Sequence, residues 1–391
     1  MDHERRAAVT RHRAHRRRIG PNALKITSAL LAALLLVPTA RAEPYIAVRT
    51  GEKCMACHVN PTGGGKRTEG GGKYAQTSFA AERLDLKTGK AVPASSEPAL
   101  WSGKINDHFA IGGDLRATAR GTFIPNTEDQ YAFDPTRAQL YLEIKPIVDR
   151  LTVYVDQRFA PGAATNREAF AMLWTEGRYA YVKAGRMFIP FGLRIEDDTA
   201  FIRQVSGTTF TSSDDGVESG LEIGPWSANV SVTNGAGGGV ETNRGKLVSS
   251  LVTFVQRSWR VGLSAATNFS GAQDRRMQSV FTGLRTGPVS WLGSWLNVTD
   301  DGTPTGRLTQ RATLAEANLE AAKGHNLKLT YEYYDPSAEV REDQRERYSA
   351  VWEYVPFQFT QFRAGVRKNN GIPQNNAQNA TEVFLQWHAF F

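Results

Sequence analysis

The sequence contains very little cysteine and no long hydrophobic run beyond its first forty residues. Its 391 residues include two cysteines, Cys54 and Cys57, which lie three positions apart. A framework of structural disulfides is therefore excluded, because both thiols belong to one short motif. From about residue 105 onward, no apolar stretch approaches the roughly 20 residues of a membrane-spanning helix. A helical membrane domain is excluded there.

Residues 1–42 have the three regions of a secretory signal peptide. Residues 1–25 are basic, residues 26–37 are apolar, and Ala40-Arg41-Ala42 is a small-residue cleavage site. This leader holds nine of the 47 Lys and Arg and two of the 39 Asp and Glu, so the remaining chain has a net charge of +1. The high isoelectric point therefore belongs to the leader, and no nucleic-acid partner is expected.

The motif Cys54-Met55-Ala56-Cys57-His58 follows the expected cleavage site by a dozen residues. Two thiols at this spacing can add across the vinyl groups of a haem, and the adjacent histidine can then bind the iron. The alternatives are a chance CxxC, a redox disulfide or half of a zinc site. No further cysteine completes a Cys-rich zinc site, and no βαβ pattern surrounds the motif. The motif predicts one haem c attached to Cys54 and Cys57, with His58 as an axial ligand of the haem iron.

The second axial ligand is less constrained, because residues 59–107 contain no Met and no His. Weak donors nearby (Asn60, Lys66 or Lys73), water, or a residue of the following region remain open. His108 is a candidate distal ligand because it opens the first predicted strand; an ordinary polar strand residue is the alternative. Lys66 and Arg67 are candidates to pair with haem propionates, with solvated charges as the alternative.

Residues 43–104 form a short segment with thin apolar content, and residues 88–104 of it are predicted to be a Pro/Ser-containing linker. So short a segment buries little core by itself, so haem or surrounding protein is expected to organise it. Its two glycine triplets, Gly63-Gly64-Gly65 and Gly70-Gly71-Gly72, lack the spacing of a phosphate-binding loop. They indicate either flexibility or a close approach of the backbone to the haem.

Residues 105–391 show period-two alternation of apolar and polar side chains. Residues 140–145 and 151–156 each place aliphatic residues on one face and polar or aromatic residues on the other. In residues 327–332, Leu327, Leu329 and Tyr331 alternate with polar residues. The pattern suits a transmembrane barrel strand, and a soluble β-sandwich is the alternative for any single strand. Sixteen strands are expected, near 106–121, 134–145, 149–159, 167–175, 177–187, 216–224, 227–235, 247–256, 258–268, 276–285, 288–297, 308–321, 325–334, 345–354, 357–367 and 380–391.

The connections between these expected strands decide between the two folds. Long connections, such as residues 188–215 and 298–307, alternate with short ones, as extracellular loops and periplasmic turns do in outer-membrane barrels. The last strand ends on the aromatic Phe391, as outer-membrane barrels commonly do. The fold class is thus all-β, an antiparallel transmembrane β-barrel of about sixteen strands with a small N-terminal c-type cytochrome segment. It is expected in the outer membrane of a Gram-negative cell, in contact with lipid.

The predicted outer loops carry pairs of adjacent carboxylates. Carboxylate oxygens suit ferrous iron, although solvated loop charges are the more common explanation for any single pair. The pairs are Glu128-Asp129, Asp197-Asp198, Asp214-Asp215, Asp300-Asp301 and Glu342-Asp343.

A secreted CxxCH segment joined to a barrel resembles the fused monohaem cytochrome–porins of iron-oxidising bacteria. The motif part of this resemblance covers residues 47–51 and Cys54 to His58. That family typically continues with a Pro- and Phe-containing stretch, whereas this chain has Asn60-Pro61 and glycines. Residues 183–192 are also similar to a strand and loop of phosphate-selective, O/P-type porins.

The resemblance to cytochrome–porins implies electron transfer across the outer membrane. An extracellular donor such as Fe(II) would reduce the haem, and a periplasmic c-type cytochrome would accept the electron, which amounts to an iron oxidase activity. Two alternatives stay open. One is a diffusion porin whose haem segment acts as a plug or sensor, and the other is a conduit that runs outward to extracellular acceptors.

Overall fold

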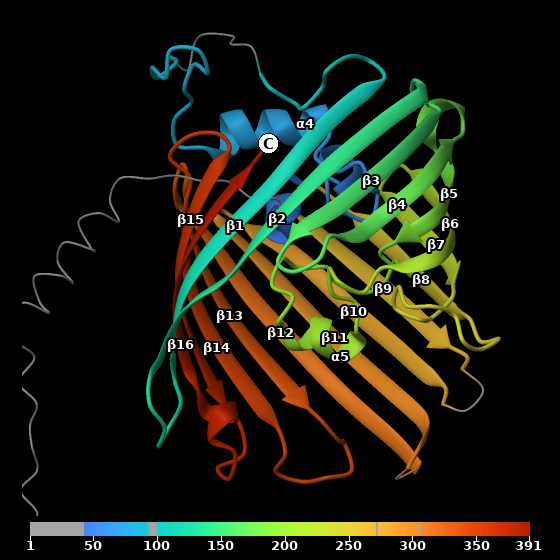
Figure 1. Ribbon diagram of the computed structural model, residues 1–391, viewed down its shortest axis with the longest axis vertical. Helices are drawn as coiled ribbons and strands as arrows, with labels where there is room; N and C mark the ends of the chain where they lie inside the picture. The colour runs from blue at the N-terminus through green and yellow to red at the C-terminus, as the bar shows by residue number, and fades with distance from the viewer. Residues whose placement is uncertain (1–42, 94–99, 271–272, 305) are drawn as a thin grey trace, which may run out of the picture. The chain divides into compact units, whose positions relative to one another are not determined.

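A computed structural model describes residues 43–93, 100–270, 273–304 and 306–391. The predicted signal peptide, residues 1–42, lies outside this range. The strands form one closed antiparallel barrel, in which every strand pairs with its neighbours in sequence and β1 pairs with β16 (Figure 1). Within the described residues, no helix is both long enough and apolar enough to cross a membrane.

The predicted fold class and the predicted strand number are both confirmed. The strands are β1 (Phe109–Phe123), β2 (Gln130–Ile147), β3 (Leu151–Ala160), β4 (Thr165–Trp174), β5 (Ala180–Met187), β6 (Asp214–Ile223), β7 (Trp226–Thr233), β8 (Leu247–Val255), β9 (Trp259–Asn268), β10 (Arg275–Thr286), β11 (Val289–Thr303), β12 (Gly306–Ala322), β13 (His325–Asp335), β14 (Arg345–Tyr354), β15 (Thr360–Asn370) and β16 (Thr381–Phe390).

Short helical segments complete the described structure. The N-terminal segment holds α2 (Pro44–Thr50), α3 (Cys54–Cys57), α4 (Glu69–Tyr74) and the π-helical turn η1 (Ala75–Phe79). The connection between β5 and β6 holds α5 (Phe201–Ser206), and two 3₁₀ turns are η2 (Glu176–Arg178) and η3 (Asn376–Asn379).

The alternating pattern places polar side chains in the lumen and aliphatic side chains on the lipid face. On β2, Leu140 and Leu142 are exposed on the outer surface, whereas Tyr141 and Glu143 are buried inside. On β3, Tyr154 and Asp156 are fully buried in the same way. A barrel in lipid needs this arrangement, since its outer surface contacts hydrocarbon. The protein is therefore an outer-membrane barrel.

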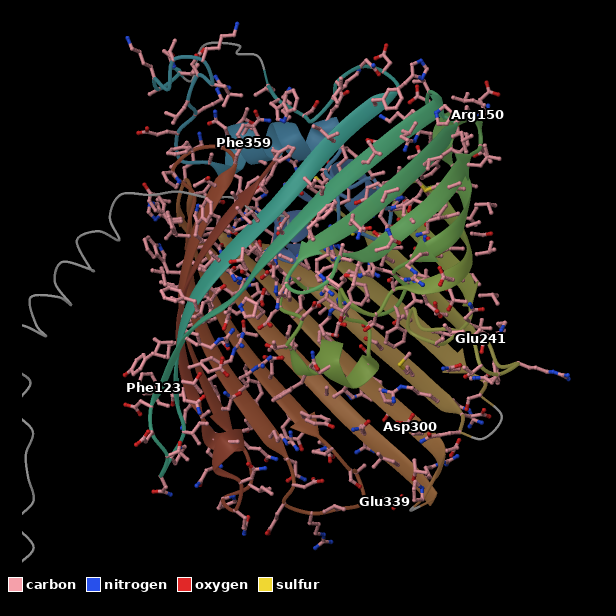
Figure 2. All side chains as sticks on the ribbon, viewed as in Figure 1. Phe123, Arg150, Glu241, Asp300, Glu339 and Phe359 are labelled. Carbon is pink, nitrogen blue, oxygen red and sulfur yellow. The ribbon has the colours of Figure 1, made fainter. Side chains whose placement is uncertain are left out.

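The two ends of the barrel differ in their connections. In Figure 2, Arg150 and Phe359 lie near the end of the short turns, and Phe123, Asp300 and Glu339 lie near the other end. The C-terminus and α4 lie at the short-turn end. Short turns face the periplasm in outer-membrane barrels, so the N-terminal segment enters from the periplasmic side.

The expected strict alternation of long and short connections is only partly correct. Residues 298–307 were expected to form a long loop, but β11 extends to Thr303 and pairs with Gly306 of β12. The connection between β3 and β4, residues 161–164, is also short. A strand pair can extend beyond the apolar band of a barrel because paired backbone groups remain satisfied in water as well as in lipid.

The connection between β5 and β6, residues 188–213, folds into the barrel and not away from it. Its helix α5 packs against β11, β12 and β13. Glu196 binds Arg116 of β1 at 2.6 Å and Arg363 of β15 at 2.7 Å. Asp197 forms an ion pair with Arg367. These contacts attach the loop to wall strands on both sides of the seam.

Gly216 on β6 lies where two strands approach too closely for a side chain. A Cβ added there would be 2.2 Å from the Val232 carbonyl oxygen and 2.6 Å from the Thr233 Cα. Gly216→Ala is expected to destabilise the barrel by about 1–3 kcal/mol through overpacking. Urea unfolding in detergent micelles, followed by heat-modifiable migration on gels, measures this.

Gly293→Ala on β11 is the matched control, because the added Cβ meets only the Thr282 methyl at 3.4 Å. Gly293→Ala should unfold like the wild type. Equal unfolding midpoints for the two variants would contradict the close approach at Gly216.

Candidate functional site

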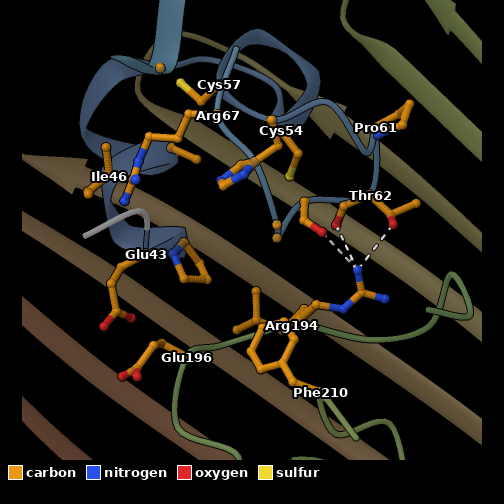
Figure 3. A pocket seen from close by; sticks show the side chains of 18 of the residues that line it. Glu43, Ile46, Cys54, Cys57, Pro61, Thr62, Arg67, Arg194, Glu196 and Phe210 are labelled. Atoms are coloured by element: carbon orange, nitrogen blue, oxygen red, sulfur yellow. Dashed lines mark hydrogen bonds between the residues drawn. The ribbon is translucent and has the colours of Figure 1, made fainter. Parts of the chain in front are cut away.

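The three residues of the haem motif lie inside the barrel at one large cavity. Cys54, Cys57 and His58 all line it, together with inward-facing wall residues. The cavity contains about 1860 Å³ of empty space, part of it open to solvent. Its lining combines the two thiols and the imidazole of the motif with the arginines Arg67 and Arg194. Figure 3 shows Cys54 and Cys57 above this space, with Arg67 reaching into it.

Local backbone hydrogen bonds fix the motif. The His58 amide donates to the Cys54 carbonyl at 2.9 Å, closing the single turn of α3. The Thr68 amide donates to the Cys57 carbonyl at 3.0 Å, and the Val59 amide donates to the Lys66 carbonyl at 3.0 Å. Residues 59–66 therefore form a folded loop, and its glycines provide the left-handed backbone that the reversal needs.

Charged wall residues hold the N-terminal segment on one side of the barrel. Lys66 pairs with Glu143 of β2 at 3.2 Å, and its amide donates to the Tyr154 hydroxyl of β3 at 2.9 Å. Asn60 donates to Glu168 of β4 at 2.7 Å. Each of these side chains is buried, so each contact lies in a water-poor environment where charge-assisted hydrogen bonds are strong.

Further wall residues hold the segment on the opposite side. The Tyr45 hydroxyl donates to Glu353 of β14 at 2.8 Å, and Arg49 donates to Asn326 of β13 at 2.8 Å. Arg260 of β9 donates to the Ala47 carbonyl at 2.6 Å and to the Glu52 carbonyl as well. The segment, residues 43–66, is thus anchored to strands on both sides of the lumen, and we call it the plug.

His58 is the residue whose environment best suits a ligand of iron. Its Nδ1 atom is buried and has no hydrogen-bond partner within the described part of the chain. Burial, followed by the positive charge of Arg67, lowers the His58 pKa to about 4. The imidazole is therefore neutral at physiological pH, the form that binds metals.

The two cysteines form no disulfide, and both line the same cavity. Burial raises the pKa of the Cys54 thiol, while the positive charges of Arg260 and Arg194 oppose this shift. Burial also raises the pKa of Cys57.

Arginines around the cavity could meet the carboxylates of a haem. Arg67 lies 4.1 Å above the Phe390 ring, and no described carboxylate forms an ion pair with it. Arg194 donates to the Thr62 hydroxyl at 3.1 Å and to the Gly63 carbonyl at 3.0 Å, as Figure 3 shows. Lys66, the other predicted propionate partner, is already paired with Glu143.

The structure does not bring His108 to the haem motif. His108 is exposed at the periplasmic end, where its Nδ1 atom lies 2.7 Å from the Lys145 carbonyl oxygen. It does not line the cavity. His388 of β16 lines the cavity together with His58, and no role was predicted for His388. Alternation along the last strand could have indicated that His388 faces inward.

The acidic pairs of the outer loops are mostly neutralised by arginine. Asp198 pairs with Arg203 at 3.3 Å, Asp300 with Arg275 at 3.0 Å, and Asp301 with Arg307 at 2.7 Å. Among the described residues, no group of three or more His, Cys, Asp or Glu side chains could hold a metal ion. The structure therefore does not gather these carboxylates into one cluster.

A second cavity lies next to the first, further from the periplasmic end. It contains about 1400 Å³ of empty space and is lined by charged residues that include Arg120, Asp134 and Arg367. The two cavities share lining residues, among them Glu43 and Arg116. The two cavities therefore adjoin, and we call the second one the outer compartment.

Comparisons with known proteins identify the class of fold. No protein-family model matches the chain, and no curated protein matches it. Among solved structures, OmpT of Vibrio cholerae, an outer-membrane protein, has a TM-score of 0.58 with 13% identity, covering 74% of this chain and 99% of that chain. The anion-selective porin from Comamonas acidovorans has a TM-score of 0.55 with 11% identity, covering 72% and 100%.

OprB of Pseudomonas putida is a third similar structure, with a TM-score of 0.56 and 8% identity, covering 73% of this chain and 94% of that chain. At such low identity the likeness concerns the fold alone. The protein therefore has the sixteen-stranded fold of outer-membrane porins.

The second glycine triplet has a specific packing role. Helix α4 crosses the motif so closely that a Cβ on Gly71 would lie 2.3 Å from the Cys57 carbonyl oxygen. Gly71→Ala is expected to displace the haem motif and to speed trypsin cleavage within residues 43–104 of the folded protein. Gly72→Ala is the matched control, because its nearest neighbour would be the Ser102 Cα at 3.5 Å.

Gly72→Ala should be neutral or slightly stabilising, since alanine favours helix over glycine by roughly 0.5–1 kcal/mol. Equal cleavage rates for the two variants would show that this triplet provides only flexibility.

Arg260 is expected to keep the plug in place. Arg260→Gln weakens its contacts with the carbonyls of Ala47 and Glu52, and hydrogen bonds to charged groups contribute about 1.5–3 kcal/mol each. Single-channel recordings in planar bilayers should show brief openings in Arg260→Gln that the wild type lacks. Arg276→Gln on β10, where Arg276 pairs with Asp301 at 3.3 Å, is the control and should stay closed. A wild type that is freely open would contradict the plug.

Proposed function

We propose that this protein transfers electrons across the outer membrane through one c-type haem held inside its barrel. An extracellular donor, Fe(II) in the first instance, reduces the haem from the outer compartment. A periplasmic c-type cytochrome takes the electron at the short-turn end. The observation that carries the proposal is the placement of the CxxCH motif at a large cavity within a plugged lumen.

The described residues fit a haem. Cys54 and Cys57 supply the two thioether positions, and the His58 imidazole at the same cavity supplies an axial ligand. Arg67 and Arg194 supply positive charge at the same cavity for the propionates. When bound, a haem supplies one-electron redox chemistry whose potential depends on the axial ligands and on burial.

The protein's own contribution is to hold a charged cofactor inside the membrane, whose hydrocarbon layer is unfavourable for charge. The apolar band of an outer-membrane barrel is roughly 25 Å tall, and hydrocarbon penalises an uncovered polar group. The lumen wall replaces that hydrocarbon with buried ion pairs such as Lys183 and Glu218, 2.9 Å apart. The outer compartment lets a small donor approach the inner cavity without leaving the protein.

A diffusion porin with a haem-bearing plug has the same fold, and it is the second candidate. The anchoring of residues 43–66 around the lumen favours the conduit, because a porin needs an open path for solutes. The direction of electron flow follows the potentials of the partners, so an outward conduit differs from the inward one in its haem potential.

Visible spectroscopy of the detergent-purified protein tests the proposal. The oxidised wild type should show a c-type haem that stays with the chain on denaturing gels, and anaerobic Fe(II) should reduce it. Cys57→Ala should lose the covalent haem while the barrel remains heat-modifiable. Met55→Leu, a volume-conserving change within the motif, should keep the haem.

The other outcomes are equally informative. A correctly inserted wild type without haem would overturn the proposed function. A haem that dithionite reduces and Fe(II) does not would reject Fe(II) as donor and favour the outward conduit or the gated porin.

A further inference from the structure

A haem iron bound by His58 would have a second axial position on the other side of the ring, and a residue of this cavity could bind there. The described lining of the cavity contains no methionine and two histidines, His58 and His388. His388 is 1% exposed, its Nε2 atom lies 2.6 Å from Asp114, and its Nδ1 atom lies 3.1 Å from Gln361. Both ring nitrogens are thus engaged by the wall, so His388 is not available to iron.

The weak donors that follow the motif, Asn60, Lys66 and Lys73, are also poor candidates for the second axial ligand. The Lys66 amine pairs with Glu143, and Asn60 contacts both Glu168 and Lys183. Lys73 is exposed and does not line the cavity. A second ligand would therefore be water or a group from another part of the chain.

Glu43, the first described residue of the N-terminal segment, lies at this cavity. Glu43 lines the cavity that holds the haem motif and is 6% exposed. Its carboxylate is anchored to the wall by Lys328 of β13 at 2.9 Å. Its carbonyl accepts from the Ile46 amide at 2.9 Å, which starts helix α2. Figure 3 shows Glu43 across the space from Cys54 and Cys57.

Helix α2 connects this residue to the motif by a short, rigid path. Its seven residues rise about 10 Å, and the left-handed Gly51 then turns the chain toward Cys54. A Cβ on Gly51 would lie 2.7 Å from the Arg257 carbonyl oxygen, so the chain at Gly51 packs tightly against the turn between β8 and β9. Residue 43 and the motif therefore stay on the same cavity.

Signal-peptide cleavage after Ala42 would make Glu43 the first residue of the mature chain. We propose that the α-amine released at Glu43 is the second axial ligand of the haem iron, opposite His58. This inference rests on the proposed function, because it needs the haem. The α-ammonium group first loses one proton to solvent, and the neutral amine then donates its lone pair to the iron without any change of oxidation state. Removal of the leader thereby completes the haem site after export.

Glu43→Gln tests the inference without extending the chain. An N-terminal glutamine cyclises when its α-amine attacks the side-chain amide carbon and releases ammonia, leaving a lactam nitrogen without a basic lone pair. Glu43→Ala is the matched control, since it loses the carboxylate contact with Lys328 yet keeps the amine. N-terminal mass spectrometry establishes cleavage after Ala42 and confirms the lactam.

The readout is the spin state of the ferric haem, from visible and electron paramagnetic resonance spectra. Wild type and Glu43→Ala should be low-spin, whereas the lactam form of Glu43→Gln should lose the low-spin signal and bind added imidazole. A second variant inserts Gly-Ser between Ala42 and Glu43, which moves the amine by up to about 7 Å. It should lose the low-spin signal as well.

Three results would overturn the inference while leaving the proposed function intact. They are a low-spin lactam form of Glu43→Gln, a high-spin wild type, and a mature chain that starts at another residue. A wild type without haem would instead overturn the proposed function.

Discussion

The structure depends on one constraint, which is that backbone polar groups cannot remain unpaired in hydrocarbon. An open sheet would leave a row of N–H and C=O groups at each edge. The chain avoids this by pairing β1 with β16 along ten residues of each strand. The closing contact reaches the last residue, since the Gly113 amide donates to the Phe391 carbonyl at 3.2 Å. Closure creates the lumen in which the remaining features lie.

Once the barrel is closed, the alternation of side chains makes the lumen polar, and a polar lumen can hold a segment with little core of its own. Glu143, Glu168 and Glu353 face inward from three strands, and each contacts the plug. Burying such charges is unfavourable unless they are paired. The plug provides hydrogen-bond and ion-pair partners for these wall groups, and the same contacts fix the conformation of the plug. The cavity at the haem motif is the space that this mutual pairing leaves open.

Much of the fold could be predicted from the sequence, because period-two alternation and turn residues are local signals. All sixteen strands lie near their predicted positions, and errors concern their ends, as at residues 298–307. The end of a long hairpin is hard to predict from sequence. Alternation of apolar and polar side chains stops where the hydrophobic face ends, whereas backbone pairing between the two strands can continue. The site was predictable only in part. The CxxCH motif indicates haem chemistry by spacing alone, whereas His108 and His388 could not be ranked without knowing which of them faces the cavity.

The sequence by itself determined the barrel, and it predicts the export signal and the haem attachment, since each depends on contiguous residues or on a fixed period. Only the tertiary structure decided that the haem motif lies inside the lumen, that Gly71 packs on Cys57, and that Glu43 lines the same cavity. These relations join residues that are distant in the chain, and closure of the sheet sets their distances. No local sequence pattern predicts these contacts, because the energy of each contact depends on a partner that the fold brings close.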